Sequence, residues 1–200
     1  MTDPADMPLS PFNAALQRAL KASAADDADT AIAALSEALQ IEPGAANARF
    51  MLGAQYAQMG RLDEAEEAFM VALLQDPALH TARFQLGLLQ MTRGKPVQAA
   101  LTWQGLGALQ ETHPLRLFSL GMTQLAQNNF EAARTLLQQG IESNRENLPL
   151  NQDMQKVLLQ IASLTHDGVS EAATQTSSEN GSGAGQENHF LVSTYQQTLH

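Results

Sequence analysis

Residues 46–79, ANARFMLGAQYAQMGRLDEAEEAFMVALLQDPAL, decide the fold because they contain two amphipathic helical patterns separated by one turn. In the first pattern Leu52, Gly53 and Tyr56 lie three and four residues apart, which places them on one face of a helix. Gly60 interrupts that pattern. The second pattern has the same spacing, carried by small and bulky apolar residues: Ala65, Ala68, Phe69, Ala72 and Leu73. The stretch predicts a helix–turn–helix unit of 34 residues.

The same unit recurs along the chain without a change of register. The Leu-Gly pair returns at intervals of 34 residues, as Leu52-Gly53, Leu86-Gly87 and Leu120-Gly121. The first alanine of the second helix returns at the same interval, as Ala31, Ala65, Ala99 and Ala133. A fixed period of this length is typical of stacked repeats, each of which buries its apolar face against its neighbours. We therefore place four repeats at residues 12–45, 46–79, 80–113 and 114–147.

The unit resembles the tetratricopeptide repeat, and we expect a bacterial member of that family. The family pattern has a Leu-Gly pair, an aromatic residue three places on, then a helix with Ala, a bulky residue and a closing Pro; Tyr56, Phe69 and Pro77 occupy the last places in the second copy. The resemblance implies an all-α, right-handed α-solenoid with a concave surface. One departure recurs: Arg49 and Arg83 stand where the family has an aromatic residue.

Other segments flank the repeats. Residues 1–11 contain three prolines and no apolar period, so we expect disorder there. Residues 148–165 carry an apolar face on one side of a helix and are predicted to cap the stack. Residues 166–188 are rich in Ser, Thr, Gly, Glu and Gln, as in a flexible linker. Residues 189–200 are again apolar.

The composition restricts the class of protein. Hydrophobic residues make up 44% of the 200 residues and aromatic residues only 5%, which suits closely stacked helices. Without cysteine, neither disulfides nor thiolate metal sites can form. The net charge of −10, with no basic stripe, argues against nucleic acid as a partner. No apolar run approaches the roughly 18 residues that span a membrane, and no signal peptide is evident, so we expect a cytoplasmic protein.

The sequence offers no catalytic, metal or cofactor site. His80 and His113 fall between repeats, where polar turn residues are expected, and no two histidines share a helix at ligand spacing. The acidic cluster of Glu64, Glu66 and Glu67 lies on a second helix, where a solvated face is expected. We therefore expect a protein that is not an enzyme and that needs no cofactor.

The resemblance assigns ligand binding to the inner face of the first helices, at the second, fifth, ninth and twelfth places of each repeat. These places are polar to small in the first half of the array and strongly apolar in the second. They lack the combination of Lys and Asn residues with which chaperone-binding members hold a C-terminal carboxylate. The predicted partner-binding residues are Leu16, Leu20, Phe50, Phe84, Leu88, Met91, Phe118, Met122 and Leu125. An apolar groove rich in Phe and Met suits an apolar or amphipathic peptide.

Two alternatives stay open for this face. Phe50, Phe84 and Phe118 can instead replace the missing aromatic residue one place earlier, which would make them core residues between the helices. The tail contains five apolar residues that could dock on the groove as a helix or as an extended segment: Phe190, Leu191, Val192, Tyr195 and Leu199. The tail would then occupy the groove of its own chain or of a neighbour, or it would serve a different partner.

The predicted function is that of a protein–protein interaction module: a chaperone, adaptor or assembly factor. Its partner would be a protein or a peptide, admitted when the tail leaves the groove. The alternative is a scaffold that forms homo-oligomers by exchanging tails.

Overall fold

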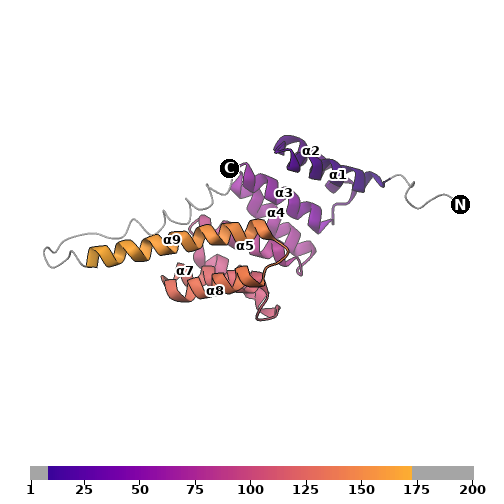
Figure 1. Cartoon of the computed structure of the whole chain (residues 1–200). Coiled ribbons are helices and arrows are strands. Elements are labelled where there is room, and N and C mark those ends of the chain that lie inside the picture. The colour runs from indigo at the N-terminus through magenta and orange to yellow at the C-terminus, as the bar shows by residue number, and fades with distance from the viewer. Residues whose placement is uncertain (1–8, 173–200) are drawn as a thin grey trace. The chain divides into compact units, whose positions relative to one another are not determined.

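Figure 1 shows the computed structural model of the chain, which describes residues 9–172 and the side chains of residues 9–164. Every regular element in this range is helical, and the described residues contain no strand. The contacts divide the chain into an N-terminal unit, Met1–Leu86, and a C-terminal unit, Gly87–His200. The predicted all-α class is confirmed.

The N-terminal unit contains two complete helix pairs and the beginning of a third. Its helices are α1 (Pro11–Ala24), α2 (Ala28–Ile41), α3 (Ala46–Gln58) and α4 (Leu62–Gln75), followed by the start of α5 (His80–Thr92). The C-terminal unit continues with α6 (Pro96–Trp103), the 3-10 helix η2 (Gln104–Ala108), α7 (Pro114–Ala126), α8 (Phe130–Ser143) and α9 (Leu148–Ala172). First helices begin at residues 46, 80, 114 and 148, at the 34-residue interval of the sequence pattern.

One residue at the fifteenth place of each repeat makes the turn between its two helices. Asp26, Gly60, Gly94 and Asn128 have positive φ angles of 55°, 72°, 70° and 60°. This left-handed conformation favours glycine and is tolerated by Asn and Asp. The next residue donates its backbone N–H to a carbonyl of the preceding helix; in the second repeat Arg61 donates to the Tyr56 oxygen at 2.9 Å.

The glycine of each Leu-Gly pair lets the second helix approach the first. A Cβ placed on Gly53 would lie 2.7 Å from Cδ1 of Phe69, and one on Gly121 would lie 2.8 Å from Cδ2 of Leu137. Gly87 meets Trp103 in the same way in the third repeat. Each glycine therefore makes room for the bulky residue on the partner helix, and these bulky side chains are buried.

The second helix of the third repeat is shorter than its counterparts. α6 ends at Trp103, and the chain continues as the 3-10 helix η2. The sequence predicts a helix to residue 109 here, with Gly105 and Gly107 inside it. A Cβ on Gly107 would meet nothing within 4 Å, so close packing does not require that glycine. Glycine costs helix stability through backbone entropy, which accounts for the early end of α6.

Helix α9 packs on α8 (Figure 1). The contact combines an apolar face with a pair of hydrogen-bonded amides. The predicted apolar face is buried in the structure at Leu150, Met154, Val157 and Ile161. In the amide pair, Asn144 donates through Nδ2 to Oδ1 of Asn151 at 2.8 Å, and Asn151 donates through Nδ2 to the Asn144 carbonyl at 3.0 Å. These two buried amides satisfy each other, and nothing in the repeat pattern signals them.

The ends of the chain differ from the predicted segments in one respect. α9 runs to Ala172, so residues 166–172 of the predicted linker are helical. If Leu148 is counted as the first place of a fifth repeat, the fifteenth place is Ala162. It is not a turn-forming residue, and the helix continues through it. Residues 1–8, the rest of the predicted linker and the apolar segment 189–200 lie outside the described residues.

Candidate peptide-binding face

In the N-terminal unit the candidate face is carried by α1 and α3. Leu16 and Phe50 are half-buried, whereas Leu20 is 56% exposed. The Phe50 ring packs against Phe69 of α4 with ring centroids 5.7 Å apart, so only part of it faces outward. Asn13 and Asn47, at the second place of α1 and α3, are exposed. The face therefore combines apolar side chains with amides that can bond a peptide backbone.

A hydrogen bond fixes the spacing of the two first helices in this unit. Gln55 of α3 donates through Nε2 to Oγ of Ser23 in α1, at 2.9 Å. Gln55 is buried, so the bond lies in an environment where losing it would leave an unsatisfied amide. Ser23 stands at the twelfth place, which the sequence assigns to the ligand face, but its hydroxyl serves the packing of α1 on α3.

The two arginines at the missing aromatic place lie partly inside the N-terminal unit. Arg49 and Arg83 are half-buried, and their Nε atoms are buried without a hydrogen-bond partner. Arg83 also donates through Nη2 to the carbonyl of Pro77 at 2.9 Å. Their aliphatic stems thus occupy part of the space that an aromatic side chain would fill. The charged end of Arg83 reaches the carbonyl of Pro77.

Five of the nine predicted partner-binding residues are buried: Phe84, Met91, Phe118, Met122 and Leu125. Phe118 has 0% exposed surface, and a Cβ added to Gly140 of α8 would overlap its ring. Phe84 likewise has 0% exposed surface. Burial favours the core interpretation for both rings, because a side chain without exposed surface cannot contact a partner directly. The four residues that keep exposed surface are Leu16, Leu20, Phe50 and Leu88.

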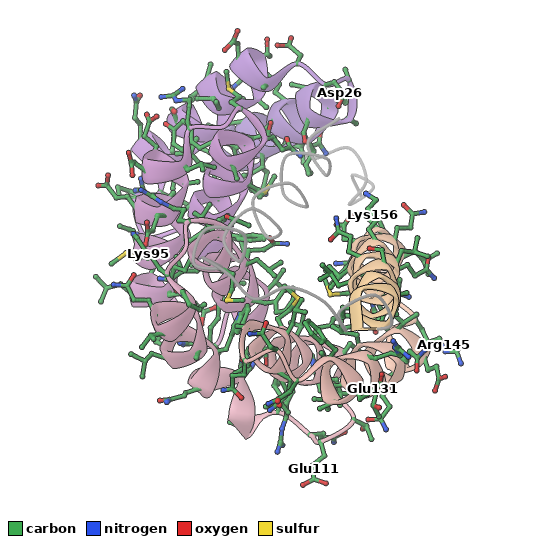
Figure 2. All side chains as sticks on the ribbon, turned by 90° about the vertical axis from the view of Figure 1, so that its left-hand side faces the viewer. Asp26, Lys95, Glu111, Glu131, Arg145 and Lys156 are labelled. Atoms are coloured by element: carbon green, nitrogen blue, oxygen red, sulfur yellow. The ribbon has the colours of Figure 1, made fainter. Side chains whose placement is uncertain are left out.

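The C-terminal unit has a lysine at a place that the family pattern assigns to the ligand face, although the predicted set of residues does not include it. Lys156 of α9 stands at the ninth place counted from Leu148, where a fifth repeat would begin, and it is exposed. Its Nζ lies 3.1 Å from Oδ1 of Asp153. In Figure 2 the labelled side chains Lys156, Arg145 and Glu131 project from the surface of this unit. The period that begins α9 at residue 148 could have identified Lys156, had it been extended one repeat further.

The second helices carry exposed apolar side chains that periodicity does not predict. Met70 and Leu74 of α4, and Val97 and Leu101 of α6, are exposed although each lies in a helix with a buried apolar stripe. Leu74 is the most open of them, at 82%. They lie away from the buried stripe of their helices and serve below as controls for the candidate face.

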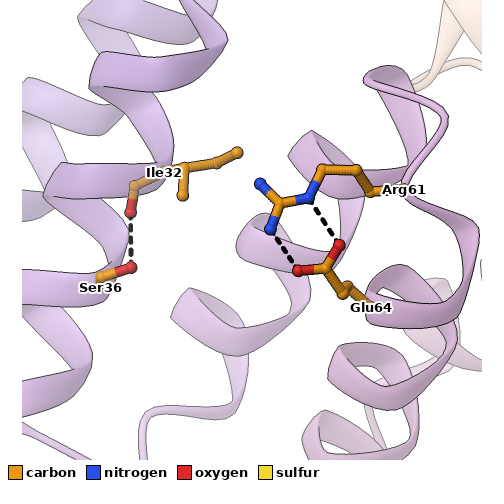
Figure 3. Close-up of polar contacts among 4 residues, drawn as sticks. All are labelled: Ile32, Ser36, Arg61 and Glu64. Atoms are coloured by element: carbon orange, nitrogen blue, oxygen red, sulfur yellow. Dashed lines mark hydrogen bonds and ion pairs between the residues drawn. The ribbon is translucent and has the colours of Figure 1, made fainter.

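Charge at the turn before α4 is paired rather than catalytic. The Arg61 guanidinium donates two hydrogen bonds to the Glu64 carboxylate, the Nε–Oε2 bond being 2.6 Å long (Figure 3). The guanidinium also lies 4.4 Å from the centre of the Tyr56 ring. The hydrogen bond from Arg61 lowers the pKa of Glu64 below its usual value. Figure 3 also shows the Ser36 hydroxyl donating to the Ile32 carbonyl at 2.8 Å, a bond within α2. These contacts stabilise turns and helices.

The two histidines whose side chains the structure describes lie at the starts of helices. His113 is the N-cap of α7, where its Nδ1 accepts from the Leu115 backbone N–H at 3.2 Å. His80 begins α5 and is half-buried. Among the described residues, no group of three His, Cys, Asp or Glu side chains could hold a metal ion. A search of the same residues finds no helix with the length and hydropathy of a membrane span.

Two family models identify the repeat. A model described as Tetratricopeptide repeat matches residues 22–91, and a second model of the same description matches residues 116–147. Together they cover just over half of the 200 residues. No curated protein matches the sequence.

Solved structures share the fold at low sequence identity. PilW, a widely conserved type IV pilus biogenesis factor, has a TM-score of 0.64 and 19% identity, covering 96% of this chain and 79% of that chain. MamA from Desulfovibrio magneticus RS-1 has a TM-score of 0.59 and 14% identity, covering 84% and 99%. An O-GlcNAc transferase from Thermobaculum terrenum has a TM-score of 0.57 and 20% identity, covering 72% of this chain but 27% of that chain.

Proposed function

Because this chain belongs to the tetratricopeptide repeat family, whose arrays are protein-interaction modules, we propose that it binds an apolar or amphipathic protein segment on the inner face of its first helices. The observation that carries the proposal is the set of apolar side chains left open at the predicted places: Leu16, Leu20, Phe50 and Leu88. The buried rings of Phe84 and Phe118 belong to the core. In this account the open leucines make the contacts.

The polar groups of the face set the chemistry of the ligand. Asn13 and Asn47 are exposed and can bond peptide groups or polar side chains. None of the predicted places within the four repeats holds a lysine that could bind a terminal carboxylate, so we expect recognition of an internal segment. The net charge of −10 favours ligands that are neutral or basic over acidic ones. A role in assembly, like that named for PilW, fits these properties, although that likeness extends to the fold alone.

A selection experiment tests the proposal without knowledge of the partner. Peptides of twelve residues are selected on the full chain by phage display, synthesised with free and amidated C-termini, and titrated by fluorescence anisotropy. We expect amphipathic sequences whose affinity does not depend on the terminal carboxylate. Leu20→Asp and Leu88→Asp should weaken binding at least tenfold, while the exposed control Leu74→Asp should not.

Two outcomes would contradict the proposal. One is a selection that yields no amphipathic peptides. The other is a set of peptides that lose as much affinity with Leu74→Asp as with Leu20→Asp, because that would place the contacts on the second helices. The sequence-based prediction that the tail enters this face concerns residues 189–200, which lie outside the described residues, and it stays a prediction.

A further inference from the structure

The last described helix stands in the place of the first helix of a fifth repeat. α9 begins at Leu148, 34 residues after Pro114 begins α7. In the four preceding repeats the fifteenth place has a positive φ angle and turns the chain into the second helix. In α9 that place is Ala162, and the helix continues to Ala172. None of the described residues therefore supplies a second helix for this fifth unit.

A pocket in the C-terminal unit lies between α9 and α8. We call it the end seat; its volume is about 530 Å³, and it is lined by Arg134 and Gln138 of α8 and by Gln155, Leu158, Leu159 and Ala162 of α9. Leu159 is 72% exposed, whereas Met91 and Leu125, at the same place of their repeats, are 1% and 4% exposed. The end seat thus has an apolar floor on α9 and a polar rim on α8.

The eighth place of α9 differs from the eighth place of the preceding first helices, and this residue limits how closely an occupant can approach the end seat. The eighth place, which is glycine in α3, α5 and α7, is Gln155 in α9. At the glycines a Cβ would collide with the bulky residue of the second helix, so a helix cannot approach α9 as closely as it approaches α3 or α7. The occupant must insert side chains into the pocket while its backbone stays further away.

We propose that residues 189–200 of the same chain dock on the end seat as a short amphipathic helix. In a helix Leu191, Tyr195 and Leu199 share one face at four-residue spacing, which supplies three side chains for the apolar floor. The end seat contains none of Leu16, Leu20, Phe50 and Leu88, so the proposal does not depend on the proposed function.

The length of chain after α9 permits this docking. From Ala162 to Ala172 the helix rises about 15 Å. Sixteen residues, 173–188, follow α9, and a flexible Gly- and Ser-rich chain of that length has a root-mean-square span of roughly 22 Å. The tail can therefore return to the end seat. The tether gives an effective concentration in the millimolar range, which suffices for a contact of modest affinity.

Engineered disulfides test the proposal cleanly, because the full chain contains no native cysteine. Three double variants each combine Thr194→Cys in the tail with one cysteine elsewhere. Ala162→Cys lies in the end seat, Leu164→Cys lies two residues on and roughly 200° around the same helix, and Asn47→Cys lies on the candidate peptide-binding face. The rate of disulfide formation under a mild oxidant is followed by mass spectrometry and non-reducing gels.

We expect the Ala162→Cys pair to close within one chain at least tenfold faster than the Leu164→Cys pair, at a rate independent of protein concentration. Equal rates for these two pairs would show only random collision of a tethered tail and would overturn the proposal. A faster Asn47→Cys pair would place the tail on the peptide-binding face instead. Disulfides formed only between chains would assign the end seat to a second copy. Either result overturns the proposal.

A charge on the apolar floor provides the second test. Leu159→Glu, added to the Ala162→Cys and Thr194→Cys pair, should slow closure at least fivefold. Leu148→Glu changes an exposed leucine of the same helix outside the pocket and should leave the rate unchanged. Both leucines are exposed, so neither change removes a core side chain. Equal effects of the two variants would refute docking on the apolar floor.

Discussion

At the residue scale, the burial of the aromatic side chain at the fifth place decides whether it belongs to the core or can contact a ligand. The fourth and fifth places of a repeat lie about 100° apart around the helix, so both border the buried stripe. Phe118, at the fifth place, is buried because Gly140 on α8 leaves room for its ring. Periodicity within one helix cannot reveal that room, since it depends on a residue of the opposite helix. This is why the sequence alone leaves the two interpretations open.

Replacement of Phe118 tests the core assignment. Phe118→Ala should lower the free energy of unfolding by about 3–5 kcal/mol, as for other buried phenylalanines, because it removes a fully buried ring and leaves a cavity. Leu20→Ala, at an exposed place, should change it by no more than about 0.5 kcal/mol. Urea unfolding followed by circular dichroism measures both. A Phe118→Ala protein as stable as the wild type would contradict the assignment.

The cap of α2 gives a pH-dependent prediction at the same scale. Asp27 accepts the Thr30 backbone N–H at 3.1 Å, and hydrogen bonds from the Thr30 side chain and backbone lower the pKa of Asp27. Because the pKa is lower in the folded state, this stabilisation is full above about pH 5 and is lost as the pH falls through the folded-state pKa. Asp27→Ala should therefore have a lower Tm than the wild type at pH 7, and the difference should shrink in acid.

Asp27→Asn is the matched variant, because its amide oxygen can cap the helix without titrating. The loss of its Tm between pH 7 and pH 3 should be smaller than that of the wild type. Thermal melts of the three proteins across this range decide the matter. An unchanged Tm difference between Asp27→Ala and the wild type at both ends of the range would show that the carboxylate does not stabilise the cap.

At the element scale, the sequence predicts which helices exist and their order, but it does not predict where α6 and α9 end. The 34-residue register predicts the turns that separate successive helices from α1 to α8. The early end of α6 depends on the backbone cost of Gly105 and Gly107, which an apolar pattern does not show. The extension of α9 depends on Ala162, which continues a helix where earlier repeats turn.

The end of the third repeat should open more readily than the second helix of the second repeat. Gly105 and Gly107 each disfavour helix by about 1 kcal/mol relative to Ala, and η2 replaces regular α-helical hydrogen bonds there. Backbone amides of residues 104–113 should therefore exchange with deuterium faster than those of residues 62–75. Equal protection of the two stretches in native-state exchange would refute this prediction.

At the scale of the whole molecule, the repeat family supports a protein-interaction module, and exposure selects the residues of the proposed ligand face. The sequence correctly indicates an all-α array of helix pairs, because one period controls both packing and turns. It predicts the ligand face less well, since the family places do not distinguish Leu20, which is open, from Phe84, which is buried. That distinction depends on contacts between helices that no single pattern contains.

Hydroxyl-radical footprinting of the full chain, with and without a selected amphipathic peptide, tests the proposed face most directly. It reports the solvent accessibility of individual side chains. The account predicts that the peptide reduces the oxidation of Leu20, Phe50 and Leu88, while Leu74 and Val97 on the second helices keep their oxidation rates. Reduced oxidation of Leu74 and Val97 with Leu20 and Leu88 unchanged would contradict it.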